Sequence, residues 1–518
     1  MNQKYLVALL AFAVLALGAY ALRDTFVQDA AAPAAQPSQV VELKNGDTYA
    51  LTAAFVEKKI GSKTFRMLAY NGSIPGPLLK ALQGAEVTIN FTNNTDIDTT
   101  LHSHGLRLDN KFDGTPGLTQ DPIKPGATFT YKLKFPDAGM YWYHPHERED
   151  YAQELGLYGN YLVTPSNDKY WSPVNREVAL FLDDILIENE AISLSKTQAD
   201  HLLMGRYGNV MLINGETDYK LSVKKGEVIR LYVTNAANVR PFNFRISGAK
   251  MKLVGADGGA YERDQWSDGV ILGPSERAVV EALFETPGTF TIENKTPNKT
   301  YALGTIVVSD ETVSTSYAAE FETLKTYDDT VSSIDPFRSS FAKEPDKTLV
   351  LTMGMGHGMM GSSNMGDHGG MMSGGPMTGP MGTTNADGIE WEDNASLMNS
   401  IAGMGMMGWQ IVDQMTNRRN MDIGWNFRIG DKIKIRIFND PNSMHPMQHP
   451  IHFHGQRFLV LAEDGKANTN LVWKDTVLVP AGRKIDILLD ASNPGSWMAH
   501  CHIAEHLENG MMFSYTLQ

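Results

Sequence analysis

The chain has 518 residues, a formal net charge of −14 and a hydrophobic share of 42%. This length exceeds that of one ordinary domain and supports sizeable buried cores, so we expect two or three globular domains. The acidic balance, with no basic stripe along the sequence, excludes nucleic acid as the main partner.

The N-terminal segment has the character of an export signal. Met1-Asn2-Gln3-Lys4 precedes an uncharged apolar run from Tyr5 to Leu22, and Ala19-Tyr20-Ala21 offers a cleavage site between small residues. The run is also long enough to remain as a membrane anchor. Residues 1–22 are therefore predicted to be a signal peptide or an anchor, with membrane association only if they stay uncleaved, and residues 23–39 a flexible tether.

A pattern that occurs three times predicts the fold. Each copy has a glycine and an acidic residue, then alternating apolar and polar residues, and ends in Asn; the copies span residues 84–93, 226–235 and 430–439. Alternation with period two is typical of half-buried strands. We therefore expect an all-β protein with three β-sandwich domains at residues 40–166, 167–312 and 346–518, and a linker at 313–345.

Ten of the 14 histidines fall in four short clusters: His102 and His104; His144 and His146; His449, His452 and His454; and His500, His502 and His506. Successive side chains of a strand point to opposite faces, so each His-x-His pair places two imidazoles on one face. Cys501 should point away from His500 and His502, and His449 away from His452. A zinc site is disfavoured, because structural zinc needs only four ligands and usually more than one thiolate.

Cys501 is the only cysteine of the chain and cannot form an internal disulfide. It is therefore either a small buried residue or a reactive or metal-bound thiolate. Together with His449, His506 and Met511 it offers two imidazoles, a thiolate and a weak axial thioether, which is the donor set of a blue-copper electron-transfer site. The eight paired histidines then remain for one multinuclear centre.

The middle copy of the pattern lacks these donors. His144 and His500 begin five residues after Gly139 and Gly495, whereas the same offset from Gly288 gives Glu293. Phe242-Asn243-Phe244 stands where the other copies have His-x-His. We therefore expect no metal ligand in the middle domain and a centre shared between the first and third domains.

These motifs resemble those of the multicopper oxidase family, because all four copper-binding motifs occur in order between residues 38 and 518. The resemblance implies three cupredoxin-like Greek-key β-sandwich domains and four copper ions: one type 1, one type 2 and two type 3. It assigns type 1 copper to His449, Cys501, His506 and axial Met511, type 2 to His102 and His452, and type 3 to His104, His144, His146, His454, His500 and His502.

The resemblance also implies catalytic roles. Cys501 is bonded through the chain to His500 and His502, so an electron from the type 1 copper reaches the type 3 pair by a short path. Asp113 matches an acidic residue near the multinuclear centre of bacterial relatives, where a carboxylate can relay protons. Its alternative role is an ordinary Asp-Gly turn.

A methionine-rich stretch bears on the substrate. Residues 353–415 contain 14 of the 26 methionines, and up to Gly382 they are set mainly among Gly and Ser. Such a composition cannot pack a core and predicts a mobile insert in the third domain. Thioethers select Cu(I), and the stretch is similar to the segment that covers the type 1 site of bacterial copper efflux oxidases. A low-complexity loop without a metal role is the alternative.

The same resemblance indicates substrate-copper ligands. Met447 matches one of them, and His445 stands where the efflux oxidases have Asp. Met444, Met355 and Met359 complete the expected set.

The leading hypothesis is an exported, periplasmic or otherwise extracytoplasmic multicopper oxidase that oxidises Cu(I) and reduces dioxygen to water in copper tolerance. The first alternative is a laccase-like oxidase of phenols or other small reductants with the same coppers. The second is a non-enzymatic copper-sequestering protein.

Overall fold

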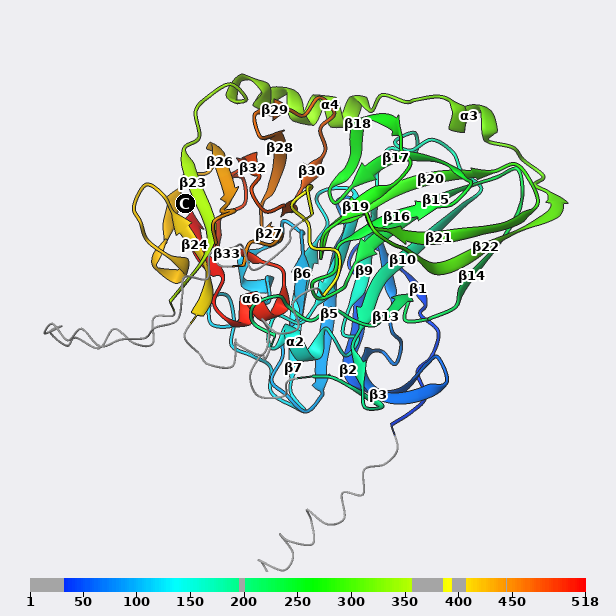
Figure 1. Ribbon diagram of the computed structural model, residues 1–518, viewed down its shortest axis with the longest axis horizontal. Helices are drawn as coiled ribbons and strands as arrows, with labels where there is room; N and C mark the ends of the chain where they lie inside the picture. The colour runs from blue at the N-terminus through cyan, green and yellow to red at the C-terminus, as the bar shows by residue number, and fades with distance from the viewer. Residues whose placement is uncertain (1–31, 195–200, 356–384, 394–406, 444) are drawn as a thin grey trace, which may run out of the picture.

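The computed structural model describes residues 32–194, 201–355, 385–393, 407–443 and 445–518. These residues form mainly strands, which confirms the prediction of an all-β protein. The strands build three two-sheet sandwiches (Figure 1): the first in blue and cyan, the second in green, and the third mainly in orange and red, with β23 in yellow-green.

The first sandwich packs a five-stranded sheet against a four-stranded one. In sheet order, the five-stranded sheet contains β1 (Val40–Leu43), β4 (Leu78–Leu82), β9 (Gly159–Thr164), β8 (Gly139–His144) and β6 (His102–His104). The other contains β3 (Lys63–Tyr70), β2 (Thr48–Ile60), β5 (Glu86–Asn94) and β7 (Thr128–Lys134). The short helices η1 (Asn110–Phe112) and α2 (Glu149–Ala152) lie in its connections.

The second sandwich has sheets of six and five strands. The larger contains β13 (Val210–Ile213), β10 (Arg176–Ile185), β15 (Glu227–Asn235), β20 (Arg277–Phe284), β17 (Lys250–Ala256) and β18 (Gly259–Trp266). The smaller contains β14 (Tyr219–Lys225), β22 (Thr300–Thr312), β21 (Gly288–Lys295), β16 (Phe242–Ile246) and β19 (Val270–Leu272), and β11 (Ile187–Glu188) pairs with β12 (Ala191–Ile192). Phe242 and Phe244 are buried in the core of this sandwich.

The third sandwich has sheets of seven and five strands. The larger contains β24 (Met407–Asp413), β23 (Lys347–Met355), β26 (Lys432–Asn439), β32 (Lys484–Asp490), β28 (Arg457–Glu463), β29 (Lys466–Ala467) and β30 (Trp473–Lys474). The smaller contains β25 (Trp425–Phe427), β34 (Met512–Leu517), β33 (Gly495–Cys501), β27 (His449–Phe453) and β31 (Thr476–Val479). Helices η4 (Asn420–Asp422) and α6 (Ala504–Glu508) flank it.

The linker between the second and third sandwiches crosses the top of the molecule in Figure 1. It contains α3 (Ala318–Glu322), α4 (Asp328–Ile334) and η2 (Asp335–Ser340). Phe321, Tyr327 and Ile334 are buried along its length. The linker is therefore packed against both sandwiches and helps to fix how they are placed.

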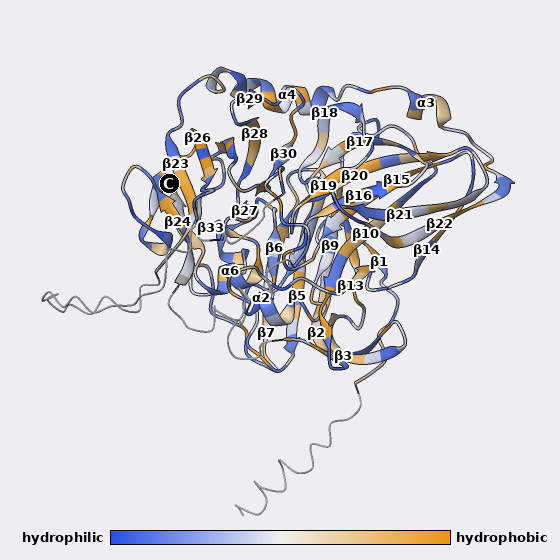
Figure 2. Cartoon of the chain, viewed as in Figure 1, coloured by the Kyte–Doolittle hydropathy of each residue, from blue (hydrophilic) through white to orange (hydrophobic). Residues whose placement is uncertain are grey.

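Hydrophobic residues are frequent on the strands, whereas hydrophilic residues are common in the outer connections (Figure 2). Strand β5 alternates between buried and less buried positions, as expected from its sequence. Strand β15 is buried throughout, because the linker residue Phe321 packs on Val228 and the first sandwich packs on Tyr232. Position in the sheet therefore overrides the simple alternation there.

Two segments differ from the expectations. Residues 33–39 were expected to belong to a flexible tether, but Ala35 N donates to Glu57 O (2.9 Å) and Gln36 N donates to Gly72 O (2.8 Å). An extended Ala- and Pro-rich chain can use free backbone groups of neighbouring strands, so this part of the tether prediction is wrong. Residues 353–355 and 407–413 were expected in a mobile insert, but they belong to the paired strands β23 and β24: 353–355 pair with 407–409, and 410–413 pair with 349–352.

Other expectations fall where the structure gives no description. The N-terminal signal or anchor, the rest of the tether before residue 32 and most of the methionine-rich insert lie outside the described residues. Within the described ranges, no helix is long and apolar enough to cross a membrane.

Candidate metal centres

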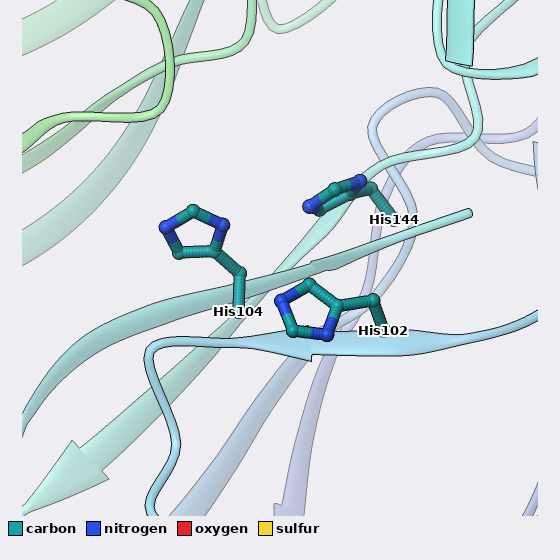
Figure 3. Close-up of side chains that lie close together, drawn as sticks. All are labelled: His102, His104 and His144. Carbon is teal, nitrogen blue, oxygen red and sulfur yellow. The ribbon is translucent and has the colours of Figure 1, made fainter. Parts of the chain in front are cut away.

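The histidine clusters of the first and third sandwiches meet at one place. In the first sandwich, His102 on β6 lies opposite His144 on β8, and in the third His452 on β27 lies opposite His500 on β33. Figure 3 shows the rings of His102, His104 and His144 gathered beside these strands. The same strand arrangement therefore presents imidazoles from both sandwiches to a common interior.

The eight paired histidines form a compact group whose side chains are buried: His102, His104, His144, His146, His452, His454, His500 and His502. His454 Nε2 lies 3.3 Å from His146 Nε2 and 3.0 Å from His500 Nε2. The ring of His502 lies 5.1 Å from that of His104 and 5.0 Å from that of His144. The two remaining histidines, His102 and His452, have ring centres 5.9 Å apart.

Hydrogen bonds leave the inner nitrogen of several rings free. The Nδ1 atoms of His102, His144 and His452 donate to the backbone carbonyls of Asp113 (2.7 Å), Pro145 (2.7 Å) and Asp475 (2.8 Å), respectively. Their Nε2 atoms have no hydrogen-bond partner among the described residues. A hydrogen bond to one nitrogen fixes the tautomer and presents the lone pair of the other, which is how metal-ligating histidines are held.

The protonation state of these rings suits a metal. Burial, aided by neighbouring histidines, lowers the pKa of His104, His144 and His452 well below the ordinary value. Burial also lowers the pKa of His500 to about 4. The rings are therefore neutral near pH 7, which is the form that binds metal ions.

Cys501 lies on the other face of β33, beside His449 and His506. Its Sγ atom is 3.5 Å from His449 Nδ1 and 3.6 Å from His506 Nδ1. Nitrogen and sulfur atoms that bind one metal at about 2.0 and 2.3 Å, with an angle of about 110°, lie about 3.5 Å apart. Burial raises the pKa of the Cys501 thiol, so a bound cation is needed to hold it as a thiolate.

Met511 is fully buried in the same core as Cys501, and its carbonyl accepts a hydrogen bond from Cys501 N (3.1 Å). Trp409 covers the two histidines beside Cys501: its ring centre lies 4.5 Å from that of His449 and 4.8 Å from that of His506. Both histidines are 0% exposed. A bulky reductant consequently has no direct contact with their ring edges.

Asp113 lies against the histidine group rather than in an exposed turn. Its Oδ2 accepts hydrogen bonds from His454 Nδ1 (2.9 Å) and Thr115 Oγ1 (2.6 Å). Its carbonyl accepts from His102. Asp113 Oδ1 is buried and has no hydrogen-bond partner among the described residues, so this oxygen is available to a bound molecule or a proton.

Two acidic residues at the site were missed in the sequence. Asp475 Oδ1 lies 3.0 Å from His104 Nε2, and buried Glu149 places Oε1 3.6 Å from His146 Nδ1. Asp475 follows Lys474 directly before the apolar strand β31, and Glu149 follows His146 by three residues within a charged run. A charge at the end of a buried strand is a usable signal, although it does not reveal its partner.

Near the type 1 candidate, His445 faces a carboxylate that the sequence did not indicate. His445 Nε2 lies 3.5 Å from Glu390 Oε2, and both residues are buried. Neither ring nitrogen of His445, nor Glu390 Oε2, has a hydrogen-bond partner among the described residues. The backbone of Glu390 is held by Tyr207, whose hydroxyl donates to its carbonyl (2.9 Å), and by Gln448, whose Oε1 accepts from its N–H (2.7 Å).

The other expected substrate ligands are only partly placed. Met447 is fully buried in the core that contains Cys501. Met444 and Met359 lie outside the described residues, and for Met355 only the backbone, at the end of β23, is described.

Comparison with known proteins gives the family of this site. Three family models described as multicopper oxidase match residues 55–168, 180–311 and 393–518. The multicopper oxidase mco of Staphylococcus aureus is 28% identical over 453 residues, covering 86% of this chain and 82% of that protein. The copper resistance protein A homologue of Pseudomonas syringae is 25% identical over 554 residues, covering 90% and 92%.

Solved structures agree. The multicopper oxidase of Campylobacter jejuni, described as a metallo-oxidase, has 25% sequence identity and a TM-score of 0.67, with 94% of each chain covered. The cupredoxin-like sandwich architecture is thereby confirmed. The buried imidazoles with free inner nitrogens, and the thiolate candidate flanked by two more, fit the copper that this family uses. The chain belongs to the multicopper oxidase family of oxidoreductases.

Proposed function

We propose that this protein is an exported cuprous oxidase, which takes one electron at a time from Cu(I) and reduces dioxygen to water, and that it serves copper tolerance. The proposal includes four coppers: type 1 held by His449, Cys501, His506 and Met511, and three held by the eight paired histidines. When bound, these ions supply one-electron acceptance at type 1 and four-electron reduction of dioxygen at the multinuclear centre.

The residues divide this work. Cys501 is adjacent in sequence to His500 and His502, so the electron path between the two centres is covalent along the chain. We keep the copper types that the sequence motifs imply: His102 and His452 bind the type 2 copper, and the other six paired histidines bind the type 3 coppers. The grouping of His146, His454 and His500 within one metal-binding distance supports one type 3 position.

Asp113 supplies protons in this proposal. Its buried Oδ1 has no hydrogen-bond partner among the described residues and lies 3.5 Å from His102 Nδ1, while Oδ2 is fixed by His454 and Thr115. A carboxylate held in this way can take up a proton from solvent and pass it on towards the multinuclear centre, so it would act as a relay.

One observation carries the choice of substrate: the type 1 histidines are buried beneath Trp409, while His445 and Glu390, whose facing atoms have no hydrogen-bond partner among the described residues, lie nearby. A small metal ion can bind imidazole and carboxylate donors, whereas a bulky phenol has no access to the histidine edges. Met447 and the methionine-rich insert add thioethers, which suit Cu(I).

A laccase-like activity remains the competing proposal, because the same coppers serve both. Non-enzymatic copper sequestration is less favoured, since it needs neither the thiolate–histidine link nor the buried Asp113. Export to the periplasm or another extracytoplasmic place is proposed from the N-terminal sequence.

Steady-state kinetics on copper-loaded protein tests the substrate. Cu(I) and a bulky phenol are compared, with and without added Cu(II), for the wild type and for a variant in which a Gly/Ser linker of equal length replaces residues 356–384. We expect the variant to lose Cu(I) turnover and to gain phenol turnover. Unchanged Cu(I) oxidation together with fast phenol oxidation in the wild type would favour the laccase-like alternative.

A further inference from the structure

A buried arginine of the middle sandwich lies next to the histidine group. Arg277, the first residue of β20, is 0% exposed. Its Nη1 donates to Asp475 Oδ1 at 2.7 Å, and its Nη2 donates to Asp475 Oδ2. This is the two-pronged pairing that a guanidinium makes with a carboxylate and that a lysine cannot reproduce.

Asp475 in turn contacts two of the proposed copper ligands. Its Oδ1 lies 3.0 Å from His104 Nε2, and its carbonyl accepts from His452 Nδ1 at 2.8 Å. The fit is close, since a Cβ atom at Gly105 would come within 2.2 Å of Asp475 Oδ2. A shift of this carboxylate would therefore move His104 directly, and a shift of the whole Asp475 residue would also move His452.

The same guanidinium also reaches the first sandwich. Arg277 Nε donates to the carbonyl of Met140 at 2.9 Å. Met140 lies in β8, the strand that ends at His144. One side chain from the sandwich without metal ligands thus connects to ligand-bearing strands of both other sandwiches.

The surrounding charges fix the position of the guanidinium. Arg277 N donates to Asp257 Oδ1 (2.9 Å), and Lys474 Nζ lies 3.3 Å from Asp257 Oδ2. Lys474 Nζ also lies 3.2 Å from buried Glu276 Oε1, so two cations and three carboxylates, Asp257, Glu276 and Asp475, are buried together. Because a buried charge is stable only when it is paired, loss of one member disturbs the geometry of the others.

We propose that Arg277 is a positioning residue of the multinuclear centre: through it, the middle sandwich holds Asp475 and thereby His104 and His452 in the geometry that binds copper. This inference rests on the proposed copper ligands. It assigns to the metal-free sandwich a direct part in the centre, beyond that of a spacer between the other two.

The test compares Arg277→Lys and Arg277→Met with Arg230→Lys as the control. Arg230 is also a buried arginine of the middle sandwich and pairs with Glu281 at 2.7 Å. None of its recorded contacts among the described residues is to a histidine. Copper content, the type 2 electron paramagnetic resonance spectrum and the copper–sulfur absorption are measured on the copper-loaded full chain.

For Arg277→Lys we expect the copper affinity of the multinuclear centre to fall about 10- to 100-fold, as for other residues that orient metal-ligating histidines. The type 2 spectrum should change, whereas the copper–sulfur absorption should not. Arg230→Lys should match the wild type in all three measurements. If Arg277→Met does not fold, Arg277→Lys alone decides.

A wild-type spectrum and affinity in Arg277→Lys would overturn the inference and leave the proposed function intact. Equal losses in Arg230→Lys would also overturn it, because they indicate general destabilisation. A wild type that binds no copper at its paired histidines would overturn both proposals.

Discussion

His452 and His500 lie directly opposite each other on the antiparallel strands β27 and β33, and in the same register Ile451 lies opposite Cys501. Because side chains alternate between faces, the two histidines enter the multinuclear group while Cys501 turns towards His449 and His506. One pair of strands would therefore serve both proposed centres. A one-residue change of register would exchange the faces and destroy both.

Cys501→Ser should separate the two centres. The hydroxyl is a poor ligand for type 1 copper, so the variant should lose the copper–sulfur absorption and about one copper per chain, while the type 2 resonance remains. Oxidation of Cu(I) should stop, because no electron enters the chain path. Visible absorption and copper analysis check this, and a retained blue band would contradict the assignment of Cys501.

Met511→Leu should raise the type 1 reduction potential, because the thioether no longer donates electron density. We expect a rise of roughly 60 mV or more, equivalent to a tenfold change in a one-electron equilibrium. The fold should tolerate this change of similar volume at a cost below about 1.5 kcal/mol. Redox titration of the visible band measures the shift.

Met512→Leu is the matched control, because Met512 is the next residue and is only half-buried. The type 1 reduction potential of Met512→Leu should equal that of the wild type. If Met512→Leu raised the potential and Met511→Leu did not, the axial ligand would be Met512.

Glu390→Gln should weaken the entry of metal substrates. The amide keeps the shape but loses the charge that faces His445 at 3.5 Å, so we expect KM for Cu(I) to rise about tenfold, the equivalent of 1.4 kcal/mol. The turnover of a phenol should stay unchanged. Glu392→Gln, on the same segment but paired with Tyr301 (2.5 Å), is the control. Equal effects at both positions would exclude a specific role for Glu390.

The buried histidines predict a pH dependence of the copper-free protein. Burial, followed by the neighbouring His445, lowers the pKa of His449 to about 3, against about 6.5 in an unfolded chain. Below pH 6.5 the unfolded state therefore binds more protons than the folded state. The free energy of unfolding consequently falls as the pH falls towards 3.

His449→Phe removes that proton uptake. Relative to the wild type, the variant should gain up to about 1.4 kcal/mol of unfolding free energy for each pH unit below 6.5. Urea unfolding of both copper-free proteins between pH 7.5 and 5 measures the difference. A difference that stays constant over this range would show that His449 is not buried in a neutral form.

Local pattern predicted much of this molecule. Period-two alternation indicated the strands, and the same alternation predicted that Cys501 would face away from His500. The structure confirms this, because His500 contacts His454 (3.0 Å) whereas Cys501 Sγ lies beside His449 (3.5 Å). The copper-binding motifs gave the family, which the comparisons confirm. Each of these signals is contained within a few neighbouring residues, so it can be recognised without knowledge of the tertiary structure.

Contacts between residues that are far apart in the sequence could not be predicted from these local patterns. Arg277 and Asp475 are 198 residues apart, and Glu390 meets His445 only because the segment around it packs on Tyr207 and Gln448. The backbone hydrogen bonds of residues 33–39 to neighbouring strands were not predicted for a similar reason. The composition of this segment does not indicate that a sheet edge with free backbone groups lies beside it. Charges with distant partners therefore need the folded chain.

The most direct test of the whole account is the copper count and visible spectrum of the wild-type protein after loading with copper. About four ions per chain, with the intense absorption of a thiolate bound to copper, are predicted. Fewer ions and a colourless solution would contradict the proposed pairing of a thiolate site with a three-copper cluster.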